Sequence, residues 1–261
     1  MAQYRPPSSL LTTLRGGCHL AALSARRMLL SRQTLVNALL LAFALLAATA
    51  WSVRHERTAV QFVQEIFLPL YVSFFLPIFS LCYASAGVAG ERQDQTLVYL
   101  LATPLPRPVI YVAKYLAALV LVSAWNLAGF AALGWLGGAA GWESFQRFWP
   151  AVALSSLAYT SLFHLFSVLL HRATIVSLGY ALILEAFLGN MPGIIKRLAI
   201  SYYTQCLVFD AGKSLGLGPA GGRTPALFLP ISGDLAQTVL LCVSGTLFLV
   251  GLWAFCRREY V

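Results

Sequence analysis

The hydrophobic residues of this chain gather in long runs separated by short polar segments. Runs of about 20 apolar residues have the length that crosses a bilayer as an α-helix. The pattern predicts six transmembrane helices, at residues 34–51, 66–88, 110–136, 148–170, 173–188 and 235–255. We therefore expect an all-α membrane protein in which residues 34–261 form a six-span transmembrane domain.

Two features of the predicted spans indicate how they depart from straight, separate helices. The second span contains Pro69 and Pro77, which remove backbone donors and should kink the helix. Only His171 and Arg172 separate the fourth span from the fifth, so these two should form a tight helical hairpin.

The segment before the first span has the pattern of an amphipathic helix. Between Cys18 and Leu29, small and apolar residues recur at helical spacing and are flanked by His19, Arg26 and Arg27. Such a helix suits the headgroup plane, so we expect residues 1–33 to contain a cytoplasmic interfacial helix, with a disordered arm as the alternative.

Composition and charge agree with a membrane location. Hydrophobic residues make up 59% of the 261 and charged residues 10%, whereas soluble domains have about 25% charged. The basic residues just before the first span, Arg26, Arg27 and Arg32, favour cytoplasmic termini in the inner membrane. The net charge of +9 then reflects contact with anionic lipid rather than with nucleic acid. The five cysteines form no C-x-x-C pair, and we expect neither a metal nor a cofactor bound by this chain.

A polar stretch between the second and third predicted spans interrupts the apolar pattern. The run Glu91–Gln95 would be costly inside the membrane, and the next segment, Thr96–Leu101, is too short to span it. Prolines at positions 104, 106 and 108 then stop any helix. We expect a short cytoplasmic helix that presents one apolar side at i, i+3, i+4 spacing to a partner, formed by Leu97, Leu100 and Leu101.

These residues resemble the cytoplasmic motif of ABC-2 type transporter permeases, in particular the small six-span permeases associated with multicopper-enzyme maturation. The resemblance extends over the whole chain and departs from the family pattern at Gln95, where glycine is usual. The residues that carry it are Glu91, Thr96, Leu97, Leu100, Leu101, Thr103, Pro104, Arg107 and Lys114, with Phe255, Arg257 and Arg258 at the end.

The resemblance implies a permease subunit of an ABC transporter, which forms the translocation path. The family also favours export as the direction of transport. In such families the helix at Thr96–Leu101 is a coupling helix that docks on a separate ATPase, and Glu91 ties it to the entry helix. The resemblance also implies a homodimer of this chain with two ATPase copies, which bind ATP and Mg. The alternative for Glu91 is a solvated charge at a helix end.

The chain itself has no recognisable ATP site. The sequence "DAGKS" at Asp210–Ser214 spells part of a P-loop, but Leu207 stands where the first glycine is needed and no strand precedes it. ATP hydrolysis is therefore expected from a partner subunit.

Two ionisable residues inside the predicted spans allow other functions. His164 lies in the fourth span and Glu185 in the fifth, and intramembrane ionisable groups are functional candidates. They could line the translocation path, serve an intramembrane enzyme, or merely pack between helices. No H-E-x-x-H or G-x-S-x-G motif and no aspartate within a span supports an enzyme. A membrane scaffold without transport activity is the third possibility.

The segment at residues 190–233 is predicted to lie outside the membrane. It is apolar in part but is interrupted by Lys196 and Arg197, so it should form short helices over the outer mouth rather than a seventh span. Within the same segment, the run "LGLGPAGGR" at residues 215–223 should be a mobile loop. A translocation path lined by common apolar and aromatic residues suits several classes of substrate, so the sequence does not identify the substrate.

Overall fold

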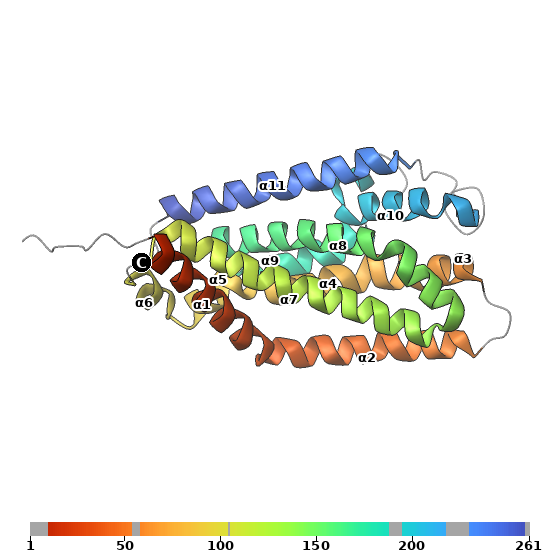
Figure 1. Ribbon diagram of the computed structural model, residues 1–261, viewed down its shortest axis with the longest axis horizontal. Coiled ribbons are helices and arrows are strands. Elements are labelled where there is room, and N and C mark those ends of the chain that lie inside the picture. The colour runs from red at the N-terminus through yellow and green to blue at the C-terminus, as the bar shows by residue number, and fades with distance from the viewer. Residues whose placement is uncertain (1–9, 54–57, 104, 188–194, 218–229, 259–261) are drawn as a thin grey trace, which may run out of the picture.

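The computed structural model of the chain is an elongated bundle of helices (Figure 1). The structure describes residues 10–53, 58–103, 105–187, 195–217 and 230–258. All regular elements in these ranges are helical and none is a strand, which confirms the all-α prediction.

Five helical stretches are long and apolar enough to cross a membrane. They are α2 (Arg32–Ser52), the continuous stretch Ala59–Ala84, α7 (Arg107–Leu136), α8 (Gly138–Leu169) and α11 (Gly233–Arg257). The predicted fifth span corresponds to α9 (Ala173–Gly179) and η2 (Tyr180–Phe187), whose described apolar helix is shorter. The structure therefore gives five full-length candidates, and a sixth crossing stays a prediction.

The stretch Ala59–Ala84 accommodates its prolines by changing the type of helix. After α3 (Ala59–Phe62), the chain forms a π-helix, η1 (Val63–Phe75), and then α4 (Leu76–Ala84). Pro69 lies inside η1, and Pro77 lies in the first turn of α4, directly after η1 ends. Wider π-turns at a proline are an established way to absorb a break in the hydrogen-bond ladder.

Helices α7 and α8 form a close antiparallel pair whose junction depends on glycine. A Cβ atom on Gly134 would lie 2.9 Å from the carbonyl oxygen of Gly141, so neither position has room for a side chain. Gly138 turns the chain with a φ of +71°. Helix α8 begins well before the predicted residue 148, because Glu143 lies on its exposed side and does not interrupt the buried side.

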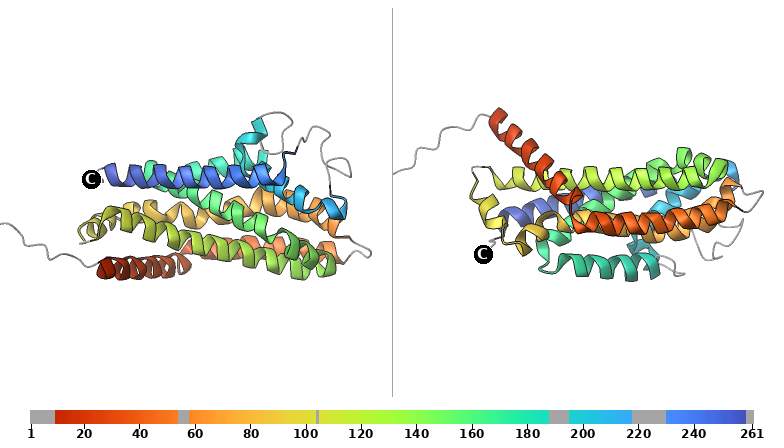
Figure 2. Two further views of the ribbon diagram at one scale, coloured as in Figure 1. Left: turned by 45° about the horizontal axis from the view of Figure 1, so that its top comes forward. Right: turned by 90° about the horizontal axis from the view of Figure 1, so that it is seen from below.

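Helix α1 (Leu10–Leu29) runs obliquely across the end at which α6 (Leu97–Leu101) and the C-terminal part of α11 also lie (Figures 1 and 2). We call this the α6 end. Helix α1 packs on α7 and turns Ser24 and Met28 inward, whereas Cys18 and Leu29 are exposed. The buried side thus agrees with the predicted apolar side at Met28 but not at Cys18 and Leu29, because α7 rather than a flat surface selects it.

Short helices occupy the described part of the segment between η2 and α11, as predicted. They are η4 (Ile195–Leu198), α10 (Ile200–Ala211) and η5 (Lys213–Leu215), toward the opposite end, which we call the α10 end (Figure 1). The "DAGKS" sequence forms the end of α10 and η5, with Lys213 paired to Asp210. Most of the predicted mobile loop lies outside the described residues.

Candidate coupling site at the α6 end

A hinge joins α5 (Ala86–Gln93) to α6. The backbone N–H of Thr96 donates to the carbonyl oxygen of Glu91 at 2.9 Å, and its hydroxyl donates to the same oxygen at 3.3 Å. Gln95 has a φ of 56°, the left-handed region that favours glycine. The departure from the family pattern at Gln95 therefore falls on the one described non-glycine residue with positive φ.

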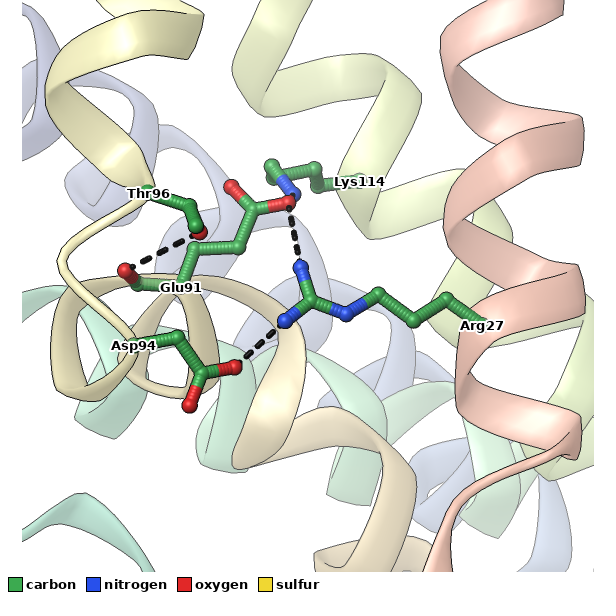
Figure 3. Close-up of polar contacts among 5 residues, drawn as sticks. All are labelled: Arg27, Glu91, Asp94, Thr96 and Lys114. Carbon is green, nitrogen blue, oxygen red and sulfur yellow. Dashed lines mark hydrogen bonds and ion pairs between the residues drawn. The ribbon is translucent and has the colours of Figure 1, made fainter.

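Three helices meet in a charged network around Glu91 (Figure 3). The Glu91 carboxylate lies 2.5 Å from the Lys114 ammonium on α7 and 3.9 Å from the Arg27 guanidinium on α1. Arg27 also pairs with Asp94, just after α5. These contacts join the entry helix, the hinge and the third long apolar helix at one point.

The Glu91–Lys114 pair lies mostly inside the protein. The Lys114 side chain is 1% exposed and that of Glu91 is 16% exposed. A buried ammonium without a counter-charge is strongly unfavourable, so Glu91 is needed to hold Lys114 charged within α7. The second carboxylate oxygen of Glu91, Oε2, is buried and accepts no hydrogen bond from the described residues.

The apolar side of α6 points into the protein rather than outward. Leu97 is only 2% exposed and packs with Val88, Ile110 and Phe255, and Leu100 is half-buried against the same cluster. The side chain of Leu101 lies outside the described part. The expectation that Leu97 faces a partner is therefore corrected, because the permease itself covers it.

The outward side of the hinge and α6 is mainly polar. Tyr99 is 78% exposed, and the neighbouring exposed residues are Gln93, Asp94, Gln95, Ala102 and Thr103. Sequence periodicity could not distinguish this side from the buried one, since both contain residues that suit an interface.

Three arginines fasten the same end of the molecule by donating to the last carbonyl groups of long helices. Arg92 donates to the carbonyl of Leu170, directly after α8, and Arg258 donates to that of Val168 at 2.9 Å. Arg107 donates to the carbonyl of Cys256 near the end of α11 at 3.1 Å. Cations stabilise helix C-termini, where carbonyls lack partners. Arg92 was missed from the sequence because its acceptor is a backbone group 78 residues away.

His164 is fully buried near the α6 end. Its ring lies 5.0 Å from that of Tyr111 and 5.6 Å from that of Tyr115, between centroids, and it packs closely on Gly87. Neither ring nitrogen has a hydrogen-bond partner among the described residues.

Glu185 is also fully buried, and its carboxylate bonds to the start of a helix. Its Oε1 accepts hydrogen bonds from the Tyr180 hydroxyl and the Ile200 backbone N–H, and its Oε2 accepts from the Ser201 N–H, all at 2.9 Å. The carboxylate thus caps the N-terminus of α10, where backbone donors lack helical partners. No hydrogen bond or ion pair in the described ranges joins it to His164, and no cluster of metal ligands is found there.

The sequence matches the family described as ABC-2 family transporter protein over residues 10–217, from α1 to the residues just after η5. A search of curated proteins gave no match. The matched region contains the charged hinge, α6 and four of the five long apolar helices. The chain therefore belongs to the ABC-2 family of transporter proteins and is a multi-pass membrane permease.

Proposed function

We propose that this permease belongs to an ABC exporter and is driven by a separate ATPase that docks at the α6 end. In this proposal the ATPase binds ATP and Mg, and the α6 end lies in the cytoplasm with both chain termini, at the inner membrane. The ends of α1 and α11 lie near α6, which supports a common side for the two termini (Figures 1 and 2).

The observation that carries the proposal is the bonding of the hinge between α5 and α6. This short segment is tied to α1 and α7 through Glu91 and to the α8–α9 turn through Arg92. A force applied to the exposed side, at Tyr99, would therefore act on several long helices at once. That arrangement suits a coupling helix better than it suits a scaffold.

We further propose a homodimer with two ATPase copies. ABC ATPases work as pairs, so two permease chains would each present one α6 to one ATPase. Exposed apolar side chains along α2 and α11 supply surfaces that lipid or a second copy can cover, for example Leu39, Phe43, Leu249 and Trp253.

The docking test replaces Tyr99 rather than Leu97. Tyr99→Asp puts a carboxylate on the exposed side, and if this side is covered by the ATPase the unpaired charge should lower co-purification at least tenfold. Leu198→Asp is the matched control, because Leu198 is similarly exposed and lies before α10. Normal ATPase binding by Tyr99→Asp, with both variants correctly inserted, would refute docking on this side of α6.

An intramembrane enzyme is less well supported. His164 and Glu185 lie in separate surroundings, and both oxygens of Glu185 are used in capping α10. As a residue of the translocation path, His164 is the better candidate, since its ring nitrogens have no partner in the described part.

The helices η4, α10 and η5 are proposed as an outer gate. If they move during transport, a crosslink from α10 to α11 should block export while ATPase binding is retained. Full transport by the crosslinked protein would exclude a gate at this position.

A further inference from the structure

A buried amide on α2 has no hydrogen-bond partner. Asn37 is fully buried, and neither its Nδ2 nor its Oδ1 is bonded to any of the described residues. An unpaired polar atom raises the free energy of the folded chain, and the penalty is large where water is excluded. Neither the charged network at Glu91 nor the helix cap at Glu185 involves Asn37. Coupling and capping therefore do not explain this residue.

A second unpaired group lies at the same level on α7. Helices α2 and α7 pack together, and both run toward the α10 end (Figure 1). The Cδ1 of Leu41 lies 3.3 Å from the place of a Cβ on Gly129, so one helical turn earlier on each helix Asn37 lies beside Trp125. The indole Nε1 of Trp125 is buried and has no partner in the described part of the chain.

An aromatic residue on α4 supports this placement. The Tyr83 hydroxyl donates to Thr34 at 3.1 Å, three residues before Asn37 on α2. The centroid of the Tyr83 ring lies 6.2 Å from that of the Trp125 ring, so Tyr83 connects the same turn of α2 to Trp125. The two unpaired groups are complementary, because the amide oxygen of Asn37 accepts hydrogen bonds and the indole N–H of Trp125 donates them.

Helix α2 is the least buried of the five long apolar helices. Of its most apolar stretch 22% is buried, against 78% for the stretch Ala59–Ala84. Its buried side includes Ala44 and Ala48, whose short side chains obstruct movement little. Toward the α10 end the Trp51 indole fastens α2 by donating to Glu65 at 2.9 Å. A tilt of α2 about this end therefore disturbs less packing than a movement of any other long helix.

We propose that α2 has a second position against α7, in which the Trp125 indole N–H donates to the Asn37 amide oxygen. The described position leaves both groups unpaired, and the second position pairs them. The penalty for the unpaired groups narrows the difference in free energy between the two positions, so the second position is populated. Helix α2 is then a moving element of the permease, and this hydrogen bond is its latch.

The first test is thermal unfolding of the purified full-length chain. Asn37→Leu removes the unpaired amide at similar volume, so it should raise the melting temperature by about 2 to 4 °C. Asn126→Leu is the matched control, because Asn126 is equally buried but its amide donates to Ser80 at 3.1 Å and to Ser156 at 2.9 Å. Asn126→Leu should therefore lower the melting temperature.

The second test is fluorine NMR of the full-length chain labelled with fluorotryptophan. Trp125→Phe identifies the signal of Trp125 among those of the six tryptophans. We expect two Trp125 lines in the wild-type chain, because an unpaired indole and one that donates a hydrogen bond have different fluorine shifts. Asn37→Leu should reduce the line of the second position about fivefold, the effect of one neutral hydrogen bond. Asn37→Gln keeps the amide and should retain both lines.

Three results would each overturn the proposal. They are a single Trp125 line in the wild-type chain, two lines whose ratio is unchanged in Asn37→Leu, and a melting temperature that falls in Asn37→Leu as it does in Asn126→Leu. The last result would mean that the amide is already bonded, for example to buried water, in a single position of α2. The wild-type spectrum decides even if a variant fails to fold. These measurements need no ATPase, so the latch and the docking proposal can fail separately.

Discussion

At each end of the permease a glutamate precedes a short helix, Glu91 before α6 and Glu185 before α10, but the two glutamates are bonded in different ways. At the α10 end, both oxygens of Glu185 accept hydrogen bonds, two of them from backbone N–H groups of α10. At the α6 end, Glu91 uses one oxygen for Lys114 and Arg27, and its other oxygen has no donor among the described residues.

The difference separates a fixed clamp from an adjustable one. Backbone donors at a helix terminus cannot move independently of the helix, so Glu185 holds α10 in one position. The partners of Glu91 are two side-chain cations on different helices, so these contacts can change when the helices move relative to one another. The adjustable clamp lies at the end that we propose to receive the ATPase.

The largest effect should come from removing the fixed clamp. Glu185→Ala leaves the N–H groups of Ile200 and Ser201 buried without acceptors, and we expect a loss of about 4 kcal/mol in the free energy of unfolding. Glu185→Gln keeps one acceptor oxygen and should lose about half as much. Thermal unfolding of the purified variants measures both. Near-wild-type stability of Glu185→Ala would show that the cap contributes little.

A smaller loss of stability with a larger loss of coupling should follow from the adjustable clamp. Glu91→Gln leaves the Lys114 ammonium buried without a counter-charge, which we expect to cost about 3 kcal/mol. The double variant Glu91→Gln with Lys114→Met removes both charges and should restore most of that stability.

The double variant separates structure from coupling. If Glu91 transmits force, the ATPase in complex with the double variant should still hydrolyse ATP. Its rate of hydrolysis should no longer respond to transport substrate. Normal substrate response in the stable double variant would mean that Glu91 only neutralises Lys114.

Five of the six predicted spans correspond to long apolar helices, because span length and hydropathy are local properties, although the helix ends differ from the predicted ones. It also located the hinge, since a polar run followed by closely spaced prolines can hardly continue a membrane helix. It missed the direction of Leu97, because an i, i+3, i+4 pattern on two helical turns fits the protein core and a partner equally. Only the packing of Leu97 on Val88 and Ile110 decides between them.

The roles of the two glutamates were predictable to different degrees. The resemblance to a family suggested that Glu91 ties the hinge to the entry helix, but it gave no indication that Lys114 is its main partner. The role of Glu185 could not be read from the sequence, because two of its donors are backbone N–H groups that any residue supplies. Helical type also escaped prediction, since Pro69 indicates a kink and η1 is a π-helix.

The smallest effect concerns an exposed ion pair at the α10 end. A hydrogen bond from Lys213, aided by the backbone of Gly233, lowers the pKa of the Asp210 carboxyl below its usual value. A lowered pKa stabilises the folded state above the unfolded value, near 4, and this contribution disappears as pH falls through the folded pKa. Lys213→Ala should lower the melting temperature slightly at pH 7 and by less at pH 3. An equal shift at both pH values would exclude the charge as its cause.

The close contact of Gly134 with Gly141 gives α7 the mechanics of a lever. Lys114 lies 20 residues before Gly134, or about 30 Å along a straight helix. If the tightly packed glycines act as the pivot, a displacement of about 1 Å at Lys114 tilts α7 by about 2°. Asn126, which is hydrogen-bonded to Ser80 and Ser156, lies about 12 Å from the pivot and would move by about 0.4 Å. Motion would therefore fade steadily along the helix, so opening the α10 end would require a second moving element besides α7.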